Sequence, residues 1–261
     1  MAHSYPSIVI IPGSFSPASM YYGVVDEIQT LTDGSSDSVF VNNLPSASRN
    51  PPEEPATLED DATFFRGIFE KLADQGKDIV VVAHSYGGVV GTESLSGVGK
   101  VERQERGQPG GVVRIVYLSA HVPEAGRSLT ELVGGAPAEM VETGKDGFLR
   151  LVGVETIAKA TFPDLDFDKA VAVVKTMSRH SALSFASKVT YPGYKHVPVS
   201  FIMCANDMIV PPDLQRGYID MIQRESGRDV DVHTLDTGHC PNTTAPDQLA
   251  KLIVDIAAAS S

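Results

Sequence analysis

The chain has 261 residues, 42% of them hydrophobic and 21% charged, which is ordinary for a globular protein with a sizeable core. Its formal net charge of -12 repels phosphate groups and no run of lysine or arginine offsets it, so we expect no nucleic-acid or membrane partner. The two cysteines, Cys204 and Cys240, have no metal-ligand spacing, which argues against a disulfide scaffold or a zinc site but leaves a single bridge open.

The residues before the first apolar run lack the basic and apolar segments of a secretion signal. No apolar run approaches the roughly 20 residues that span a bilayer, so we expect a cytoplasmic protein. Short runs rich in β-branched residues then predict strands that are covered on both faces, as in a parallel sheet. These runs are residues 7–11, 38–42, 78–83, 112–119, 197–204 and 230–235.

Helical patterns lie between the strands, at residues 57–74, 86–95 and 245–258. Strands that alternate with helices over most of a chain indicate an α/β layer fold with a mostly parallel sheet and helices on both faces. Two loops interrupt the alternation: a proline-rich one at 44–55, and a charged surface connection at 97–111.

The segment 122–196 contains no convincing sheet strand, although it lies between two of the predicted strands. Helical patterns occur in it at 128–133, 155–161 and 166–179. We therefore predict a helical cap at 122–196 over a core formed by 1–121 and 197–261. Six side chains in the cap suggest an apolar lining, although such residues also fill ordinary cores: Phe148, Phe162, Phe167, Met177, Phe185 and Tyr191.

Ser85 stands where the predicted strand 78–83 passes into a helix. The local sequence is Ala-His-Ser-Tyr-Gly, a variant of the Gly-x-Ser-x-Gly nucleophile elbow with alanine at the first small position. Small flanking residues let a strand turn sharply into a helix and leave the serine strained and exposed at the apex. The strand before it and the helix after it favour a nucleophile over a helix-capping serine.

A serine hydroxyl needs a base and a carboxylate that orients the base, and elbow folds supply them in the chain order serine, acid, histidine. Asp207 follows the strand 197–204 and His239 follows the strand 230–235. Each stands past the carboxyl end of a strand, where α/β folds place active sites. We predict Ser85, Asp207 and His239 as the catalytic residues.

Other residues could compete for these roles. Asp213 and Asp236 are alternative acids, although solvation at the surface is the usual fate of an aspartate. His233 falls within the last strand, and His84 precedes the nucleophile, where it could support the site from behind. The remaining histidines have no partner pattern and are expected to be structural or exposed: His3, His180 and His196.

An acyl-transfer site also needs two donors for the oxyanion. The amide of Tyr86, the residue after the nucleophile, is one. The loop after the first strand supplies the second, because Gly13 allows close approach of the backbone and the amide of Ser14 follows it. Phe15 and Met20 are then expected to line the substrate pocket.

Five segments together resemble the compact α/β-hydrolase group of plant methylesterases and hydroxynitrile lyases with their microbial relatives. They are "IIPGSF", "VVAHSYGG", "IVYLSAHVPEAGRSL", "CANDMIVPPDLQ" and "TGHCPNTTAPDQLA", and the resemblance runs from Ile8 to Leu252. It implies the α/β-hydrolase fold, the triad already named, and the amides of Ser14 and Tyr86 as the oxyanion hole. The segment that enters the cap contains His121, an expected substrate contact.

The chain departs from this family at two informative places. The esterases commonly have His-Gly where this chain has Pro12 and Gly13. The lyases carry threonine at the Gly13 position and lysine directly after the catalytic histidine, where this chain has Cys240. Since a thiol cannot stabilise a cyanide-like anion as a lysine does, ester hydrolysis is favoured over cyanohydrin cleavage.

The leading hypothesis is a serine hydrolase that cleaves a small, largely apolar carboxylic ester or lactone through an acyl-enzyme. Two other hypotheses stay open: a carbon–carbon lyase of the hydroxynitrile or retro-aldol type, and a small-molecule receptor on a hydrolase fold. No cofactor and no metal is implied. A homodimer is conceivable by analogy with the family.

Overall fold

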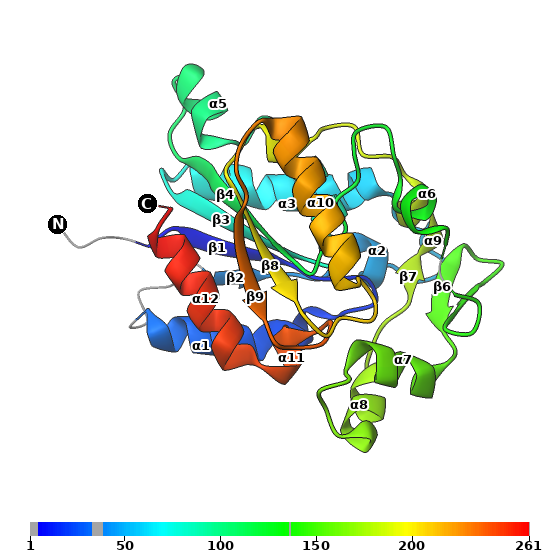
Figure 1. Ribbon diagram of the computed structural model, residues 1–261. Coiled ribbons are helices and arrows are strands. Elements are labelled where there is room, and N and C mark those ends of the chain that lie inside the picture. Colours follow the sequence, from blue (N-terminus) through cyan, green and yellow to red (C-terminus); the bar gives the residue numbers. More distant parts are fainter. Residues whose placement is uncertain (1–4, 33–38, 136, 261) are drawn as a thin grey trace.

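Six strands form one parallel sheet in the order β2–β1–β3–β4–β8–β9 (Figure 1). The computed structural model describes residues 5–32, 39–135 and 137–260, so His3 and the first residue of the predicted strand 38–42 lie outside it. The strands are β1 (Ser7–Ile11), β2 (Val39–Val41), β3 (Asp78–His84), β4 (Gly111–Leu118), β8 (Val199–Cys204) and β9 (Asp231–Leu235). All six strands predicted from the sequence are confirmed to within about two residues.

Alternate residues of β1, β3, β4 and β8 enter two separate apolar layers, because successive side chains of a strand point to opposite faces. Ile8 and Ile10 belong to one layer, with α1 (Tyr22–Leu31) and α12 (Pro246–Ala258). Val9 and Ile11 belong to the other, with α3 (Leu58–Ala73), α4 (Gly87–Ser94) and α10 (Pro212–Ser226). Burial on both faces explains why these four strands are mostly apolar, whereas the edge strand β9 is largely exposed and is not covered on both faces as the sequence predicted.

Local sequence signals set the ends of the main helices. Thr57 caps α3 and forms a reciprocal capping box with Asp60. The helix α10 begins at Pro212 and ends at Ser226, and it is followed by Gly227, whose φ of 65° lies in the left-handed region that favours glycine. Four shorter helical elements complete the core: η1 (Ala18–Tyr21), α2 (Pro45–Ser48), α5 (Lys100–Glu105) and α11 (Pro241–Thr244).

The part of the segment 122–196 from α6 to α9 lies at the carboxyl end of the parallel strands, and its last residues pack along α4 and α10 as the chain returns to the start of β8 (Figure 1). Its helices are α6 (Leu129–Val133), α7 (Val154–Thr161), α8 (Phe167–Val174), α9 (Ala182–Ala186) and η2 (Gly193–Lys195). It also contains an antiparallel sheet of β5 (Val141–Thr143), β6 (Phe148–Leu151) and β7 (His180–Ser181). We call residues 122–196 the cap.

Three expectations about the elements need correction. The cap is not purely helical, since the small sheet β5–β6–β7 joins its helices. The helix predicted at 166–179 ends at Val174, after which a turn leads into β7. The charged connection 97–111 contains the helix α5, whose Arg103 is buried on an ion pair with Asp74. Among the described helices, none combines the length and apolar character needed to cross a membrane.

Candidate active site

Ser85 occupies a sharp turn between β3 and α4, with a φ of 54° in the left-handed region. Its amide donates to the carbonyl of Leu118 at 3.1 Å, and its carbonyl accepts from the amides of Gly88 at 2.9 Å and His121 at 3.1 Å. The end of β4 therefore holds the backbone of Ser85 from both sides. A left-handed conformation at a residue other than glycine is costly and persists only where surrounding contacts impose it.

The two glycines after Tyr86 are required by backbone contacts. A Cβ on Gly87 would lie 2.5 Å from the carbonyl oxygen of Ile11, and one on Gly88 would lie 2.5 Å from that of His121. Contacts this short do not occur for real Cβ atoms, so α4 can start against the ends of β1 and β4 only with glycine at both positions. This requirement is the physical reason for the sequence Ser-Tyr-Gly-Gly.

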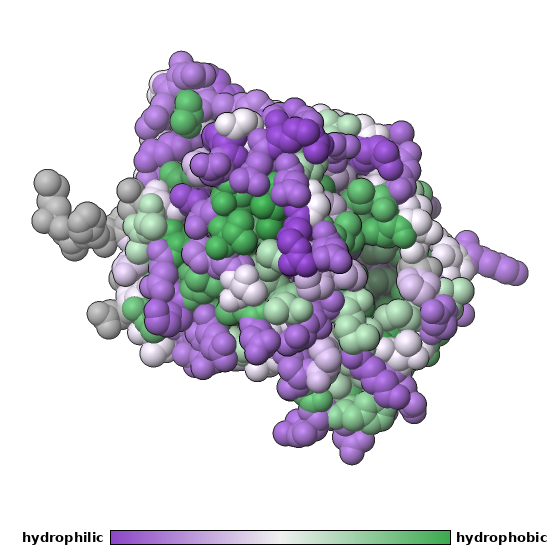
Figure 2. Space-filling view, in the orientation of Figure 1, coloured by the Kyte–Doolittle hydropathy of each residue, from purple (hydrophilic) through white to green (hydrophobic). Residues whose placement is uncertain are grey.

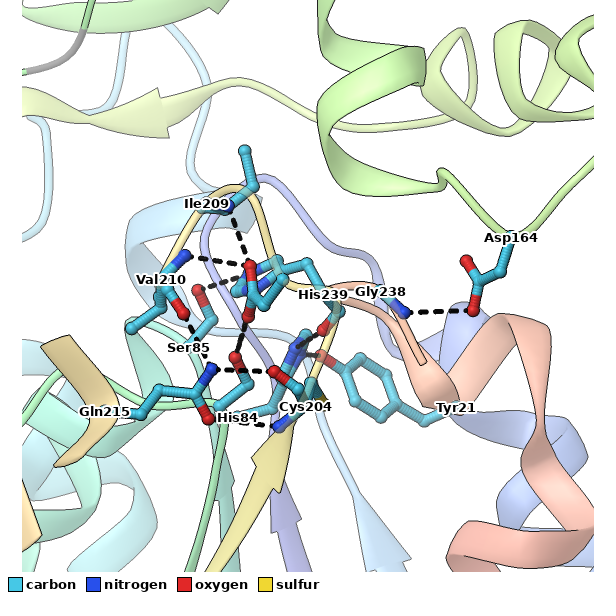
Figure 3. A network of polar contacts seen from close by, with 12 residues as sticks. Tyr21, His84, Ser85, Asp164, Cys204, Ile209, Val210, Gln215, Gly238 and His239 are labelled. Atoms are coloured by element: carbon cyan, nitrogen blue, oxygen red, sulfur yellow. Dashed lines mark hydrogen bonds and ion pairs between the residues drawn. The ribbon is translucent and has the colours of Figure 1, made fainter. Parts of the chain in front are cut away.

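The side chains of Ser85, His239 and Asp207 meet at this edge of the sheet, and Figure 3 shows Ser85 beside His239. The hydroxyl oxygen of Ser85 lies 3.0 Å from Nε2 of His239, and Nδ1 of His239 lies 2.8 Å from Oδ2 of Asp207. All three residues are buried. Because an ionised carboxylate only accepts, Nδ1 carries the proton, which leaves Nε2 free to accept from the serine.

Asp207 is stabilised in its ionised form. Burial opposes ionisation, but the nearby His239, with hydrogen bonds from His239, Ser119 and the amide of Val210, lowers the pKa of Asp207 below its usual value. Oδ1 accepts from the amides of Ile209 at 2.7 Å and Val210 at 2.8 Å, which fixes the carboxylate (Figure 3). Asp207 thus faces His239 as a rigid anion.

Ser119 is a functional candidate that the sequence reasoning missed. It follows β4, its φ of 41° is left-handed, and it is fully buried. Its hydroxyl donates to Oδ2 of Asp207 and lies 3.3 Å from Nδ1 of His239. The available signal was position, because Ser119 follows a strand at the same edge of the sheet as the predicted residues.

Tyr21 and His84 lie directly behind the triad (Figure 3). Nε2 of His84 is 2.9 Å from the carbonyl oxygen of His239, and Nδ1 is 2.6 Å from the hydroxyl of Tyr21. The amide of Gly13 donates to the same hydroxyl at 2.9 Å. His84 was expected to support the site from behind, whereas Tyr21 was not singled out.

Two backbone amides beside Ser85 have no hydrogen-bond partner among the residues that the structure describes. They belong to Ser14 and Tyr86, and both residues border the cavity above Ser85. The amide of Gly13, by contrast, is occupied by Tyr21. Phe15 carries a left-handed φ of 60° in the same loop. The loop after β1 and the start of α4 thus present free donors next to the serine.

A cavity of about 520 Å³ opens above Ser85, between the core and the cap. Figure 2 shows a hollow bordered by apolar residues at this place. Gly13, Phe15 and His121, which the sequence analysis expected near the substrate, are among its lining residues. Apolar cap residues such as Leu149, Leu151, Ile157 and Met177 form the roof, and no Asp, Glu, Lys or Arg occurs among the described lining residues.

Several predicted residues lie elsewhere. Met20 is not part of the cavity wall, because it packs between the α1–α12 layer and an apolar cluster of the cap. Of the six apolar cap residues, only Met177 and Phe185 border the cavity, while Phe148 and Phe162 are fully buried. Phe167 is exposed.

The competing acids and bases make contacts of their own. The side chain of Asp213 is 95% exposed and pairs with Arg216. Asp236 accepts from Asn206. His233 pairs with Asp231 at 3.0 Å. Of the other histidines, His180 is buried in contact with the rings of Phe15, Tyr86 and Phe185, and His196 stacks on Tyr191.

Cys204 and Cys240 are both buried free thiols, so the bridge that the sequence left open does not form. Cys240 follows His239 and borders the cavity. Burial, with the negative charge of Asp207, raises the pKa of the Cys240 thiol well above its usual value. The site therefore holds a neutral thiol where the resembling lyases carry a lysine.

The chain is similar to known proteins over nearly its whole length. A sequence profile described as the alpha/beta hydrolase family matches residues 8–252. A probable hydrolase of Phoma sp. is 34% identical over 252 residues, which cover 97% of this chain and 98% of that protein. Methylesterase 7 of Arabidopsis thaliana is 25% identical over 257 residues, with 88% of this chain and 90% of that protein covered.

Solved structures agree with this fold. A pyrethroid hydrolase from Sphingobium faniae superposes with a TM-score of 0.71 at 18% identity, over 97% of this chain and 98% of that one. A polyneuridine aldehyde esterase superposes with a TM-score of 0.68 at 19% identity, over 97% of this chain and 99% of that one. At such identities the likeness concerns the fold alone.

Proposed function

Because the chain belongs to the α/β-hydrolase family, we propose that it is a serine hydrolase that cleaves a small, neutral carboxylic ester or lactone. One observation carries the proposal: Ser85, His239 and Asp207 form a continuous hydrogen-bonded relay beneath an uncharged cavity. The activated nucleophile distinguishes this function from that of a receptor, since binding alone needs none.

In this mechanism, the hydroxyl of Ser85 attacks the substrate carbonyl while Nε2 of His239 accepts its proton. Asp207 holds the imidazole in the correct tautomer and stabilises the imidazolium that forms. His239 returns the proton to the departing alcohol, which leaves the acyl group on Ser85. Water, activated in the same way, then releases the acid and regenerates the serine.

The negative charge that develops on the carbonyl oxygen needs donors that are already in place. We assign this role to the amides of Ser14 and Tyr86, which border the cavity and have no partner among the described residues. The amide of Tyr86 also lies at the start of α4, where the helix dipole favours a negative charge.

The cavity wall supports a neutral substrate on both sides of the scissile bond. A buried carboxylate or ammonium without a charged partner costs several kcal/mol, and the described wall offers no such partner. The volume of about 520 Å³ suits a small-molecule ester.

Ester hydrolysis is favoured over carbon–carbon cleavage because Cys240 is neutral and no cation lies in the described cavity wall. A cyanide-like leaving group would carry a full negative charge into that wall. An alcohol that leaves with the proton of His239 carries none. The hydrolytic reaction therefore matches the electrostatics of the site better.

A fluorophosphonate probe tests the nucleophile. We expect stoichiometric labelling of the wild type, no labelling of Ser85→Ala, and unchanged labelling of Ser226→Ala, whose serine lies at the far end of α10. Sustained turnover of p-nitrophenyl butyrate should follow the same pattern. Equal labelling of wild type and Ser85→Ala would remove Ser85 as the nucleophile, and tight ligand binding without turnover would favour a receptor.

A further inference from the structure

Tyr21 and His84 connect the loop after β1 with the loop that carries His239. A serine hydrolase needs these two loops in a fixed relative position. The amide of Gly13, in the loop after β1, donates to the hydroxyl of Tyr21. That hydroxyl contacts Nδ1 of His84, and Nε2 of His84 contacts the carbonyl oxygen of His239 (Figure 3). The three bonds measure 2.9, 2.6 and 2.9 Å.

The direction of each bond follows from the chemistry of the end groups. A carbonyl oxygen only accepts, so Nε2 of His84 carries the proton and donates to His239. A neutral imidazole with its proton on Nε2 has a bare Nδ1, which accepts from the hydroxyl of Tyr21. The lone pairs of the Tyr21 oxygen then remain free for the amide of Gly13. Every donor and acceptor along the link is used.

Burial keeps the link in this one state. Tyr21 and His84 are each 1% exposed. Burial lowers the pKa of His84 to about 3 and raises the pKa of Tyr21, so that neither side chain changes charge near neutral pH. The ring of His84 borders the cavity, whereas Tyr21 lies outside the cavity wall, so breaking a bond to the Tyr21 hydroxyl leaves an unpaired polar group away from the cavity.

The ends of the link lie next to the groups that the proposed mechanism uses. Gly13 precedes Ser14, whose amide we assign to the oxyanion hole, and a Cβ on Gly13 would lie only 3.1 Å from Cβ of Ser85. At the other end, the bonded carbonyl belongs to His239 itself. Tyr21 is not part of the cavity wall and so does not touch substrate.

We propose that Tyr21 and His84 are positioning residues: they hold the loop after β1, which carries Gly13 and Ser14, and the backbone of His239 at a fixed distance from each other. The proposal rests on the proposed function of Ser85 as a nucleophile. A displacement of catalytic groups by about 1 Å can lower the rate about 10²-fold. Because the link prevents such a displacement, we expect its loss to reduce the stabilisation of the transition state more than the affinity for substrate.

The test compares three variants with the wild type: Tyr21→Phe, His84→Leu and the double variant. Tyr117→Phe is the matched control, since Tyr117 is an equally buried tyrosine whose hydroxyl bonds Thr92 at 2.8 Å, outside the site. The readouts are kcat and KM for p-nitrophenyl butyrate, the Ki of a trifluoromethyl ketone that forms a tetrahedral adduct, and the melting temperature. Fluorophosphonate titration counts the active molecules in each sample.

We expect Tyr21→Phe to lower kcat by about 10- to 100-fold and to raise the Ki of the trifluoromethyl ketone by a similar factor. The KM should stay within about threefold of the wild-type value. Tyr117→Phe should lose stability but keep kcat per active molecule. Because Tyr21 and His84 act as one unit, the double variant should be no slower than the slower single variant.

Three results would overturn the proposal: a kcat for Tyr21→Phe equal to that of Tyr117→Phe, a loss confined to KM, or losses that multiply in the double variant. Should Tyr21→Phe fold poorly, the double variant decides, because it removes both polar side chains together. A wild type that neither turns over nor reacts with the probe would overturn the proposed function itself, and the positioning role with it.

Discussion

Asp164 of the cap accepts a hydrogen bond from the amide of Gly238, the residue before His239, at 3.1 Å (Figure 3). The same carboxylate oxygen accepts from the hydroxyl of Thr244 at 2.7 Å. A Cβ on Gly238 would lie 2.5 Å from Cδ of Pro163, so the cap rests directly on the loop of the proposed base. The cap therefore supports this loop as well as forming the roof of the cavity.

This contact predicts a catalytic role for the cap that is independent of substrate binding. Asp164→Ala should lower kcat by about three- to tenfold and the free energy of unfolding by about 1 kcal/mol, because the loop that carries His239 loses an acceptor. Asp166→Ala is the control, since among the described residues this exposed carboxylate pairs with Lys169 alone. Steady-state kinetics and urea denaturation measure both effects; equal kcat values for the two variants would contradict the role.

The hydrogen bond from Ser119 to Asp207 predicts that a Ser119 variant loses activity and stability at a higher pH than the wild type when the solution is acidified. The pKa of Asp207 lies below its usual value, so its ionised form stabilises the folded protein. This contribution to the free energy of unfolding is present above the usual carboxyl pKa, and it is lost as the pH falls through the lowered pKa of Asp207. Ser119→Ala removes a donor to that ionised form. The pKa of Asp207 should rise, and both kcat/KM and stability should begin to fall at a higher pH.

The control for this shift is Ser200→Ala. Ser200 also donates to an aspartate, Asp231 at 2.8 Å, but at the opposite end of the sheet. Profiles of kcat/KM and of the free energy of unfolding between about pH 2 and 8, a range that includes the lowered pKa of Asp207, should separate the two variants. If the acid limb of Ser119→Ala coincides with those of the wild type and Ser200→Ala, Ser119 does not act through Asp207.

The glycines allow a prediction about stability. Gly87→Ala should destabilise the protein by several kcal/mol or prevent folding, because the new Cβ would lie 2.5 Å from the carbonyl oxygen of Ile11. Gly217→Ala, inside α10 with nothing within 4 Å, should instead stabilise it by about 0.5–1 kcal/mol. Thermal denaturation compares the two variants, and a stable Gly87→Ala would show that α4 can move away from β1.

The positions of Ser85, Asp207 and His239 could be predicted because each follows a strand whose pattern is visible locally. Parallel strands bring their carboxyl ends to one edge, so residues far apart in the sequence meet there without any knowledge of contacts. Tyr21 and Ser119 could not be found in this way. Their importance lies in a single hydroxyl, whose partner is known only once the loops are placed.

Several elements escaped prediction, among them α1, α10 and the small cap sheet, and the last two did so for different physical reasons. The helix α10 carries Gly217 and a mixture of charged and apolar residues, so its apolar face, including Tyr218 and Ile222, is a weak signal. The cap strands β5, β6 and β7 have three, four and two residues. Strands this short depend on pairing with distant residues, which local patterns do not reveal.

His121 predicts a preference among substrates. Its Nδ1 lies 3.0 Å from the hydroxyl of Tyr218, and that hydroxyl has no other hydrogen-bond partner among the described residues. Because the hydroxyl proton needs an acceptor, Tyr218 donates to Nδ1, and the imidazole then carries its own proton on Nε2. Burial lowers the pKa of His121 to about 4, so the ring stays neutral above that pH. Its Nε2–H has no partner among the described residues, and the ring borders the cavity.

His121→Phe should therefore raise KM for methyl acetoacetate, which carries a second carbonyl oxygen, by about tenfold, with less effect on methyl pentanoate. Tyr218→Phe should have a smaller effect in the same direction, because it frees the tautomer without removing the ring. Competition between the two esters measures the preference. Equal changes of KM for both substrates would indicate that His121 contributes to the shape of the cavity wall but donates no hydrogen bond to the second carbonyl oxygen.

The uncharged cavity predicts discrimination against anionic esters. Methyl butyrate and the monomethyl ester of succinic acid are similar in length, but the second carries a carboxylate at neutral pH. That charge would lose its hydration in a wall without a described cation, close to the ionised Asp207. We expect kcat/KM for the anionic ester to be lower by about 10²-fold or more.

Two arginine variants test the origin of this difference. Leu151→Arg, within the wall, should narrow the gap in kcat/KM between the two esters by at least about tenfold. Val152→Arg, at the neighbouring exposed position, adds the same charge outside the cavity and should leave the gap unchanged. If both arginine variants narrow it equally, the discrimination comes from the net charge of the whole protein, and raising the ionic strength should then abolish it.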